Sequence, residues 1–312
     1  MKYLKFLCGT LLFSIIFIEV LVFGIICEPK DVYQSSYQSL IQDKFRILME
    51  TDSPKIIMVS GSSSAFGLNQ KMLEEASGYK VANLGLHAGF GHLFISELAK
   101  ANINEGDIVL LGYEYGWHSE NGFNDLGTDL IMSGIDDNIE MYKYIPARKW
   151  CTILGYLFTY AENKNAPHTS ASGQYSREAF DPKTGQMTFE RNYNMEWSKE
   201  MYGTLDISDV MISDESISYL TEYKEYVESK GASIYFVAPP IIIDSVVCDY
   251  NEFYKLKELE EAEIGIEYIS DPVQYFYPSE WMSNAMYHCN SVGEDVRTEM
   301  LIEDLRNASI IE

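Results

Sequence analysis

The sequence predicts an α/β fold in which a mainly parallel sheet of five strands lies between two layers of helices, preceded by one transmembrane helix. Two observations predict the sheet. Short runs alternate with helix-like stretches, and these runs are apolar without interruption, as is typical of parallel strands that are buried on both faces. The third observation is a nearly continuous apolar stretch close to the N-terminus, which predicts the transmembrane helix.

The apolar stretch from Phe6 to Cys27 has about the length that a helix needs to cross a bilayer. Lys2 and Lys5 precede it and acidic residues follow it, so the positive-inside rule places the N-terminus in the cytoplasm. Residues 25–27 make a poor signal-peptide cleavage site. We therefore expect an uncleaved, single-pass anchor in the cell membrane, with the folded domain on the extracytoplasmic side.

The composition excludes one class of partner. The chain has 23 basic and 47 acidic residues, a formal charge of -24, so its surface repels phosphate backbones and we expect no nucleic-acid binding. The five cysteines are widely spaced without a CxxC pair, which predicts neither a disulfide framework nor a cysteine metal site. We expect residues 1–28 to form the anchor, 29–54 a stalk and a first helix, and 55–312 the α/β domain.

The first half of the domain alternates between strands and helices. Short apolar runs bounded by turn residues predict strands at 56–60, 81–84 and 107–112. Helical periodicity predicts helices at 94–101 and at 69–76, and Gly78 lies just beyond the end of the latter as a stop signal. A glycine-rich loop at 85–91 follows the second strand.

The alternation fails between about 113 and 206. We interpret this stretch as an insertion or lid between the third and fourth strands, because long connections in compact domains are usually functional or disordered. It holds aromatic clusters, a helix-like portion around 150–160 and a Gly/Ser-rich piece at 169–175. Alternation then returns, with helices predicted at 214–230, 251–263 and 292–305 and strands at 233–240 and 266–269.

Candidate reactive residues follow the strands, because ligands collect at the carboxyl ends of parallel strands. The first strand runs into Gly61, Ser62, Ser63 and Ser64. A serine at such a turn can attack a carbonyl carbon while its own amide stabilises the resulting oxyanion. A plain Gly-Ser turn is the alternative interpretation.

The loop after the second strand contains several glycines, and a glycine amide there can supply a second oxyanion donor. Its spacing does not match a dinucleotide fingerprint, so no cofactor is predicted. His87 and His92 can be metal ligands together with His118, but the sequence gives them no common geometry. The favoured interpretation is that these are loop histidines whose ring nitrogens have hydrogen-bond partners in the protein, and no metal site is predicted.

Glu114 follows the third strand. An ionised carboxylate has no proton to donate to an oxyanion, but it can orient a histidine or a sugar hydroxyl. A solvated or salt-bridged strand end is an equally good interpretation of this residue.

The run Asn284-Ala-Met-Tyr-His288-Cys-Asn290-Ser-Val-Gly293 precedes the last predicted helix. It places His288 on a loop that can return to the edge of the sheet near the serines. An imidazole titrates in the range needed to take a proton from a serine hydroxyl, and a third group should hold the ring by its other nitrogen.

These residues together resemble the SGNH, or GDSL-like, hydrolase superfamily, over essentially Lys55 to Leu305. The carriers of the resemblance are Gly61-Ser-Ser63 after the first strand, the glycine loop after the second, and His288 before the last helix. The segments Ile269-Ser-Asp-Pro272, Asn284 to Gly293 and Arg297-Thr298 are similar to membrane-anchored members that read Asp-x-x-Tyr-His-Leu-Asn-x-x-Gly followed by Arg-Thr. The resemblance implies a flavodoxin-like three-layer α/β/α fold.

The resemblance also implies roles for individual residues. Ser63 is the expected nucleophile, His288 the base, and the amides of Ser63 and Gly89 part of the oxyanion hole. Two positions depart from the family pattern: Asn284 stands where the subgroup usually has aspartate, and Glu114 stands where the superfamily has an oxyanion-binding asparagine. Asn284 can orient the imidazole through its carbonyl, but it cannot stabilise an imidazolium by charge.

Asn290 joins Gly89 and Glu114 as a candidate for oxyanion or substrate binding. The predicted function is an extracytoplasmic serine esterase or O-acyltransferase that acts on a cell-envelope or exported polysaccharide. Expected partners are an acylated carbohydrate or a small ester, the membrane, and proteins of envelope biosynthesis. The alternative is a catalytically weakened carbohydrate-binding or assembly protein, which Asn284 and Glu114 motivate. A scaffold that recruits partners through Glu19 in the anchor ranks last.

Overall fold

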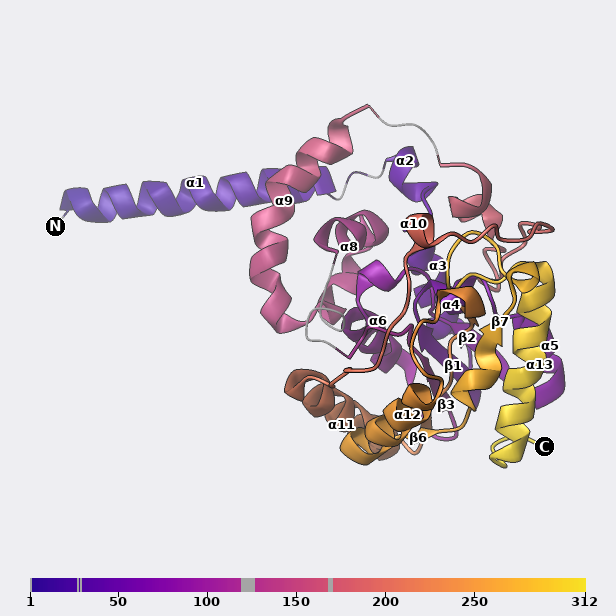
Figure 1. Cartoon of the computed structure of the whole chain (residues 1–312). Helices are drawn as coiled ribbons and strands as arrows, with labels where there is room; N and C mark the ends of the chain where they lie inside the picture. The colour runs from indigo at the N-terminus through magenta and orange to yellow at the C-terminus, as the bar shows by residue number, and fades with distance from the viewer. Residues whose placement is uncertain (1, 27, 29, 119–126, 168–170) are drawn as a thin grey trace.

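A computed structural model describes residues 2–26, 28, 30–118, 127–167 and 171–312 of the chain. Cys27 of the expected anchor lies outside the described residues, as do the start of the Gly/Ser-rich piece at 169–175 and part of the expected insertion. The chain folds as an α/β domain from which one long helix projects (Figure 1).

Five parallel strands form the central sheet in the order β2-β1-β3-β4-β6. β1 lies between β2 and β3 and pairs with both, so that Ile57 lies opposite Ala82 and Val109. The predicted mainly parallel five-stranded sheet is therefore confirmed. The strands span Lys55–Ser60 (β1), Lys80–Asn83 (β2), Ile108–Gly112 (β3), Ser233–Phe236 (β4) and Glu267–Tyr268 (β6).

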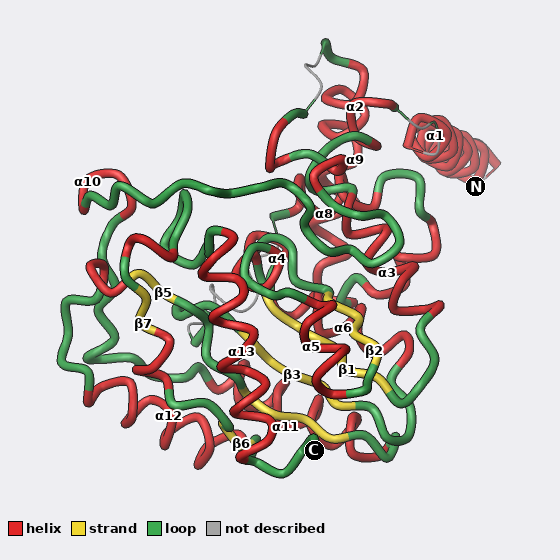
Figure 2. Tube along the Cα trace, turned by 90° about the vertical axis from the view of Figure 1, so that its right-hand side faces the viewer, coloured by secondary structure: helices red, strands yellow, loops and turns green. Residues whose placement is uncertain are grey.

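Helices cover both faces of the sheet, which confirms the three-layer arrangement. Ile57 and Val59 of β1 pack in the core on the side of α3 and α6, whereas Ile56 and Met58 pack toward α5 and α13. Figure 2 shows α5 and α13 in front of the sheet and α11 behind it. The helices are α3 (Leu40–Glu50), α5 (Gln70–Ser77), α6 (His92–Ala99), α11 (Asp214–Ser229), α12 (Asn251–Ile264) and α13 (Ser291–Asn307).

The ends of α5 show how local sequence sets an element. Asn69 caps its first turn by accepting a hydrogen bond from the backbone N–H of Met72, as asparagine commonly does at this position. Gly78 ends the helix in the left-handed conformation, at φ 74°, which a residue with a Cβ atom adopts only at a cost. The predicted stop at Gly78 is confirmed.

A second, two-stranded sheet was not expected from the sequence. Its strands β5 (Ile241–Ile242) and β7 (Phe276–Tyr277) run parallel to each other. The fourth strand, expected over 233–240, ends at Phe236, and Pro239 and Pro240 precede β5. The backbone N–H of Ile242 donates to the carbonyl of Met286, so this small sheet supports the loop that carries His288.

The segment between β3 and β4 contains helices and extended pieces in its described parts. The helices are α8 (Thr128–Ile135), α9 (Trp150–Asn165) and α10 (Lys199–Tyr202), followed by α11. This segment packs against the N-terminal part of the domain: Arg177 pairs with Asp43 of α3, and Ser36 forms a β-bridge with Ser176. The expected domain boundaries remain predictions.

The N-terminal helix α1 (Lys2–Ile26) is long and apolar enough to cross a membrane, by length and composition. Most of its side chains are exposed, but Val22 and Ile26 near its C-terminal end are buried against the domain. Two single-turn helices complete the chain, α2 (Asp31–Gln34) after α1 and α4 (Ser62–Ala65) directly after β1.

Candidate active site

Ser63 lies in the first turn of α4, at the carboxyl end of β1, and its side chain is fully buried. Its backbone N–H donates to Oε1 of Glu114 at 2.7 Å, and its hydroxyl donates to the carbonyl of Gly112 at 3.5 Å. Arg297 of α13 donates to the carbonyl of Ser63 at 2.8 Å. The serine is thus held by Gly112 at the end of β3, by Glu114 just after it, and by Arg297 of α13.

Gly61 makes the close approach of Glu114 possible. A Cβ atom added at position 61 would overlap the carboxyl group of Glu114, so no larger residue fits while Glu114 keeps its place. The glycine is needed here for space, since its φ of -87° is accessible to any residue.

Glu114 is a buried carboxyl group with only part of its hydrogen-bonding capacity used. Burial raises its pKa, and the N–H of Ser63 and the charge of Arg297 act against that rise. Its second oxygen, Oε2, has no hydrogen-bond partner and lies 3.9 Å from Nε2 of His92. Of the two alternatives, a solvated or a salt-bridged strand end, the burial of Glu114 rules out the first: its carboxyl group lies beside His92 and accepts from the amide that the resemblance assigned to the oxyanion hole.

His288 is held by Asn284. Nδ1 of the imidazole lies 3.0 Å from Oδ1 of Asn284, and the ring stacks on Phe66 with 4.0 Å between the ring centroids. Burial lowers the pKa of His288 to about 3, with further lowering by the charges of Arg191 and His87. The carbonyl of Asn284 accepts a hydrogen bond from Nδ1–H, which leaves the lone pair of the neutral ring on Nε2.

The fold brings the serine and histidine segments together. Phe66, three residues after Ser63, stacks on His288, and a Cβ atom at Gly67 would touch both the carbonyl of Ser63 and the sulfur of Cys289. Within the described part of the chain, no hydrogen bond joins the hydroxyl of Ser63 to His288. The serine and histidine segments are thus neighbours, while the hydroxyl of Ser63 donates to the carbonyl of Gly112.

Tyr175 is a site residue that the sequence did not single out. Its hydroxyl accepts a hydrogen bond from Nδ2 of Asn284 at 2.6 Å and lies 3.5 Å from Nδ1 of His288. Its ring packs on Phe66 and on Tyr37 at centroid distances of 5.6 Å. It is one of 23 tyrosines in the chain, and no local pattern distinguishes it from the others.

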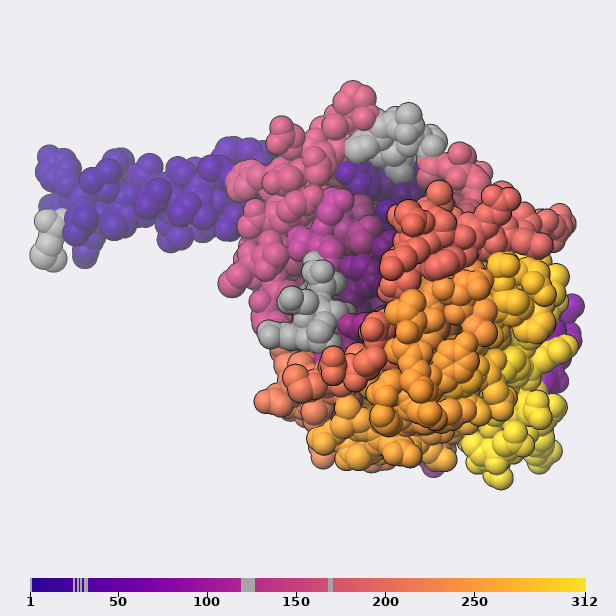
Figure 3. Space-filling view, viewed as in Figure 1, coloured from indigo at the N-terminus to yellow at the C-terminus, as the bar shows by residue number. Residues whose placement is uncertain are grey.

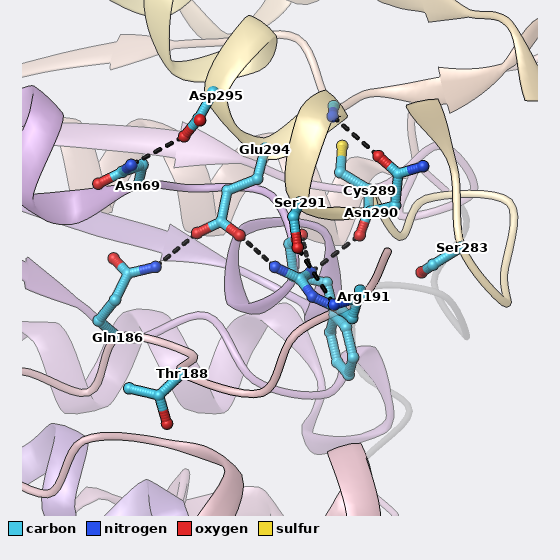
Figure 4. A network of polar contacts seen from close by, with 12 residues as sticks. Asn69, Gln186, Thr188, Arg191, Ser283, Cys289, Asn290, Ser291, Glu294 and Asp295 are labelled. Atoms are coloured by element: carbon cyan, nitrogen blue, oxygen red, sulfur yellow. Dashed lines mark hydrogen bonds and ion pairs between the residues drawn. The ribbon is translucent and has the colours of Figure 1, made fainter. Parts of the chain in front are cut away.

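Arg191 is a second residue near the candidate site that the sequence did not single out (Figure 4). Its guanidinium, fully buried, donates to the carbonyls of Phe66 and Cys289 and pairs with the carboxylate of Glu294. Glu294 in turn accepts a hydrogen bond from Gln186 at 2.5 Å. One side chain thus links the end of the serine segment to the residue that follows the histidine.

Two candidate residues lie near the site with their polar atoms already engaged. The amide of Gly89 donates to Nδ1 of His87 at 2.9 Å rather than pointing free into an oxyanion position. The side chain of Asn290 caps α13, accepting from the amides of Val292 and Gly293, and donates to two backbone carbonyls. Asn290 therefore has no capacity left for a substrate, and its place in the structure is that of a helix cap.

The three histidines that were weighed as metal ligands have separate partners. His87 receives the amide of Gly89, Nε2 of His118 lies 2.7 Å from Glu260, and His92 packs on Tyr113. Among the residues that the structure describes, no group of three or more metal-ligating side chains is present.

No family model matches the chain, and no curated protein matches it. Among solved structures, the chain is similar to the YxiM protein of Bacillus subtilis, with 13% sequence identity and a TM-score of 0.38. The match covers 83% of this chain and 58% of the YxiM chain, so this chain spans less than two thirds of that protein's length.

Proposed function

We propose that this chain is a serine esterase or O-acyltransferase, with Ser63 as the nucleophile and His288 as the base. The observation that carries the proposal is the hydrogen bond between Asn284 and His288 next to the segment that bears Ser63. A buried imidazole held by Nδ1, stacked on the serine segment, is the arrangement that general-base activation of a hydroxyl needs.

The proposed reaction begins when the hydroxyl of Ser63 turns from the carbonyl of Gly112 to Nε2 of His288. The oxygen then bonds to the ester carbonyl carbon while its proton passes to Nε2. The tetrahedral intermediate collapses as the alcohol leaves with that proton, and the acyl group remains on Ser63. Water or a sugar hydroxyl next attacks the acyl group through the same base, giving hydrolysis or transfer.

The oxyanion of this intermediate needs the amide of Ser63, which donates to Glu114 in the present conformation. A substrate oxygen must therefore displace Oε1 of Glu114 or share the amide with it. An ionised Glu114 opposes the developing negative charge, whereas a neutral Glu114 carries a proton that it can donate. The charge state of Glu114 thus controls the reaction in this proposal.

The substrate proposed for this site is an acyl ester of a cell-envelope or exported carbohydrate, with a small ester as a surrogate. Tyr175 beside His288 supports this choice, because an aromatic ring can stack on a sugar face. The apolar helix α1 supports attachment to the cell membrane, with the domain on the extracytoplasmic side and envelope-biosynthesis proteins as partners.

The test uses the full-length chain in detergent, because α3 and the end of α1 are part of the domain's core. We expect hydrolysis of aryl acetates and covalent labelling by a fluorophosphonate, both abolished by Ser63→Ala. Ser62→Ala is the matched control, since Ser62 is adjacent but less buried, and it should keep both signals. Absence of hydrolysis and labelling in the unmodified chain would refute the enzyme proposal.

A second candidate function is a carbohydrate-binding or assembly protein with little turnover. The engagement of the Ser63 amide by Glu114 and the missing bond between Ser63 and His288 favour it. This candidate predicts glycan binding that survives Ser63→Ala, measured by calorimetry, together with no turnover. Turnover that Ser63→Ala abolishes would exclude it.

A further inference from the structure

Helix α9 presents an apolar face to solvent. Its side chains Cys151, Leu154 and Phe158 are exposed, Leu154 by 52% and Phe158 by 60%. Positions three and seven residues apart share one face of a helix, so these side chains form a single stripe. Gly155 and two threonines complete the exposed face over its first three turns.

The opposite face of α9 is well packed. Ile153 and Tyr160 are fully buried, and Ala161 is nearly so, in the main core. No charged residue occurs from Trp150 to Ala161, although the chain as a whole carries a charge of -24. The helix is therefore seated firmly in the domain, and its outward face lacks the charges that usually cover an exposed helix.

The C-terminal end of α9 adjoins α1. Nζ of Lys164, near the end of α9, donates to the carbonyl of Ile26 at 2.6 Å and pairs with Asp136. Val22 and Ile26 are the buried residues of α1 at this junction. Figures 1 and 2 both show α1 leaving the domain beside α9, and Figure 3 shows the surface of α9 on the side from which α1 projects.

The length of α1 sets the level of this junction relative to a bilayer. The apolar stretch that can span a membrane runs from Lys2 to Gly24. At about 1.5 Å per residue this is roughly 35 Å, slightly more than a hydrocarbon core of about 30 Å. The last turn of α1, where α9 packs, therefore lies at the boundary between acyl chains and headgroups.

We propose that the exposed face of α9, formed by Cys151, Leu154 and Phe158, lies in the surface of the bilayer that α1 spans. The face holds no cation, so the contact is with the acyl-chain boundary and needs no anionic lipid. This inference rests on the membrane anchoring in the proposed function, but not on any chemistry at Ser63. It gives the domain a second membrane contact and thereby one orientation.

The test measures membrane depth with nitroxide labels in the full-length chain, reconstituted in nanodiscs of zwitterionic phosphatidylcholine. Native Cys8, Cys27, Cys151 and Cys248 are replaced by serine, and Cys289 remains because it is buried. Single cysteines are then introduced by Leu154→Cys and Phe158→Cys. Val292→Cys is the matched control, an apolar residue of α13 that is 57% exposed and lies away from α1.

We expect the ratio of collision rates with oxygen and with a water-soluble nickel chelate to be several-fold higher at positions 154 and 158 than at 292. Equal ratios at the three positions would overturn the proposal. Spin-spin broadening at 154 and 158 that dilution with unlabelled chain removes would overturn it too, because a second copy would then cover the face.

A label introduced by Leu12→Cys, in the middle of α1, separates the possible failures. It should show the highest oxygen ratio of the series, because position 12 lies in the hydrocarbon core if α1 spans the bilayer. A ratio at 12 as low as that at 292 would overturn both the anchoring and the inference on α9. Fluorophosphonate labelling of Ser63 is measured on the same samples and reports on the enzyme proposal independently.

Discussion

The carboxyl group of Glu114 accepts a hydrogen bond from the backbone N–H of Ser63 at 2.7 Å. This amide is the one that the oxyanion of an acyl-transfer intermediate needs. The side chain that competes for it is fully buried, and its other oxygen lacks a hydrogen-bond partner. The proposed reaction therefore depends on the charge and position of one carboxyl group.

Replacing Glu114 by glutamine should increase the rate of acylation. The amide oxygen of Glu114→Gln can still accept from Ser63, while its NH₂ group is a neutral donor in place of an ionised oxygen. We expect roughly a tenfold to hundredfold gain in fluorophosphonate labelling and aryl acetate hydrolysis, since one oxyanion donor is worth about 10²-fold or more. Glu260→Gln, at a buried carboxyl that bonds to His118, should give no gain.

The gain in acylation rate that Glu114→Gln gives over the native chain should also depend on pH. Burial raises the pKa of Glu114, so lowering the pH neutralises the native side chain and allows it to donate. The rate ratio of variant to native chain should therefore fall toward one as the pH is lowered. A ratio that is constant or rises toward acid would show that the charge of Glu114 does not govern the rate.

Asn284→Asp should strengthen the base. An aspartate at this position keeps the acceptor for Nδ1 of His288 and adds the negative charge that stabilises an imidazolium. Because the reverse change, aspartate to asparagine, costs about 10⁴-fold in a serine protease triad, we expect at least a tenfold rise in kcat. Asn284→Ala, which removes the acceptor, should lower kcat instead. A slower Asn284→Asp variant would contradict this role of Asn284.

The pH dependence of kcat/KM should report the pKa of His288. Burial lowers this pKa to about 3, so the neutral base persists far below the usual imidazole range. In the Glu114→Gln background, which lacks the carboxyl titration, kcat/KM should stay flat between about pH 5 and 7. Adding Asn284→Asp should shift the acid-side fall of kcat/KM to higher pH, because the carboxylate raises the pKa of the His288 ring. An acid limb near 6.5 without that change would contradict the burial of His288.

Stability should fall in acid for the same reason. His288 has a lower pKa in the folded chain than its ordinary 6.5, so the unfolded chain binds a proton that the folded chain does not. Its contribution to stability is present above about pH 6.5 and is lost at about 1.4 kcal/mol per pH unit as the pH falls toward 3. Chemical denaturation at pH 7 and 5 should show a larger acid loss for the native chain than for His288→Gln.

Arg191→Met should destabilise the fold strongly. The change leaves the buried carboxylate of Glu294 unpaired and removes donors from the carbonyls of Phe66 and Cys289, a loss of about 3–5 kcal/mol. Denaturant titration followed by circular dichroism measures it. Adding Glu294→Gln should recover part of the loss, whereas Arg306→Met at an exposed arginine should cost under about 0.5 kcal/mol. Equal effects at 191 and 306 would refute the linking role of Arg191.

The fold was largely predictable because its sheet signals are local. Runs such as 56–60 and 107–112 are apolar on both faces, and Gly78 ends α5 where a left-handed residue is needed. β5 and β7, of two residues each, were not predicted. The expected strand at 233–240 was too long, because the apolar run continues through two prolines that follow β4.

The site was predictable only where its partners are close in sequence or fixed by the family resemblance. Asn284 and His288 are four residues apart, and a hydrogen bond joins their side chains. Tyr175 contacts His288, and Arg191 donates to the carbonyl of Cys289. In each pair the partners are about a hundred residues apart in the sequence, so no local pattern predicts the contact. The direction of Glu114 was left open for a similar reason, since it depends on the space that Gly61 provides.

The ammonium of Lys164 in α9 donates to the carbonyl of Ile26, the last residue of α1, and so ties the end of that helix to the domain. A domain on a flexible linker moves relative to the membrane and can reach substrates at many distances from it. Val22, Ile26 and Lys164 hold the end of α1 against the domain, so under the proposed membrane anchoring the candidate site stands at one height above the lipid. Under the proposed function, an acyl group is then selected by where its carrier molecule extends from the membrane, before any recognition by the residues around Ser63.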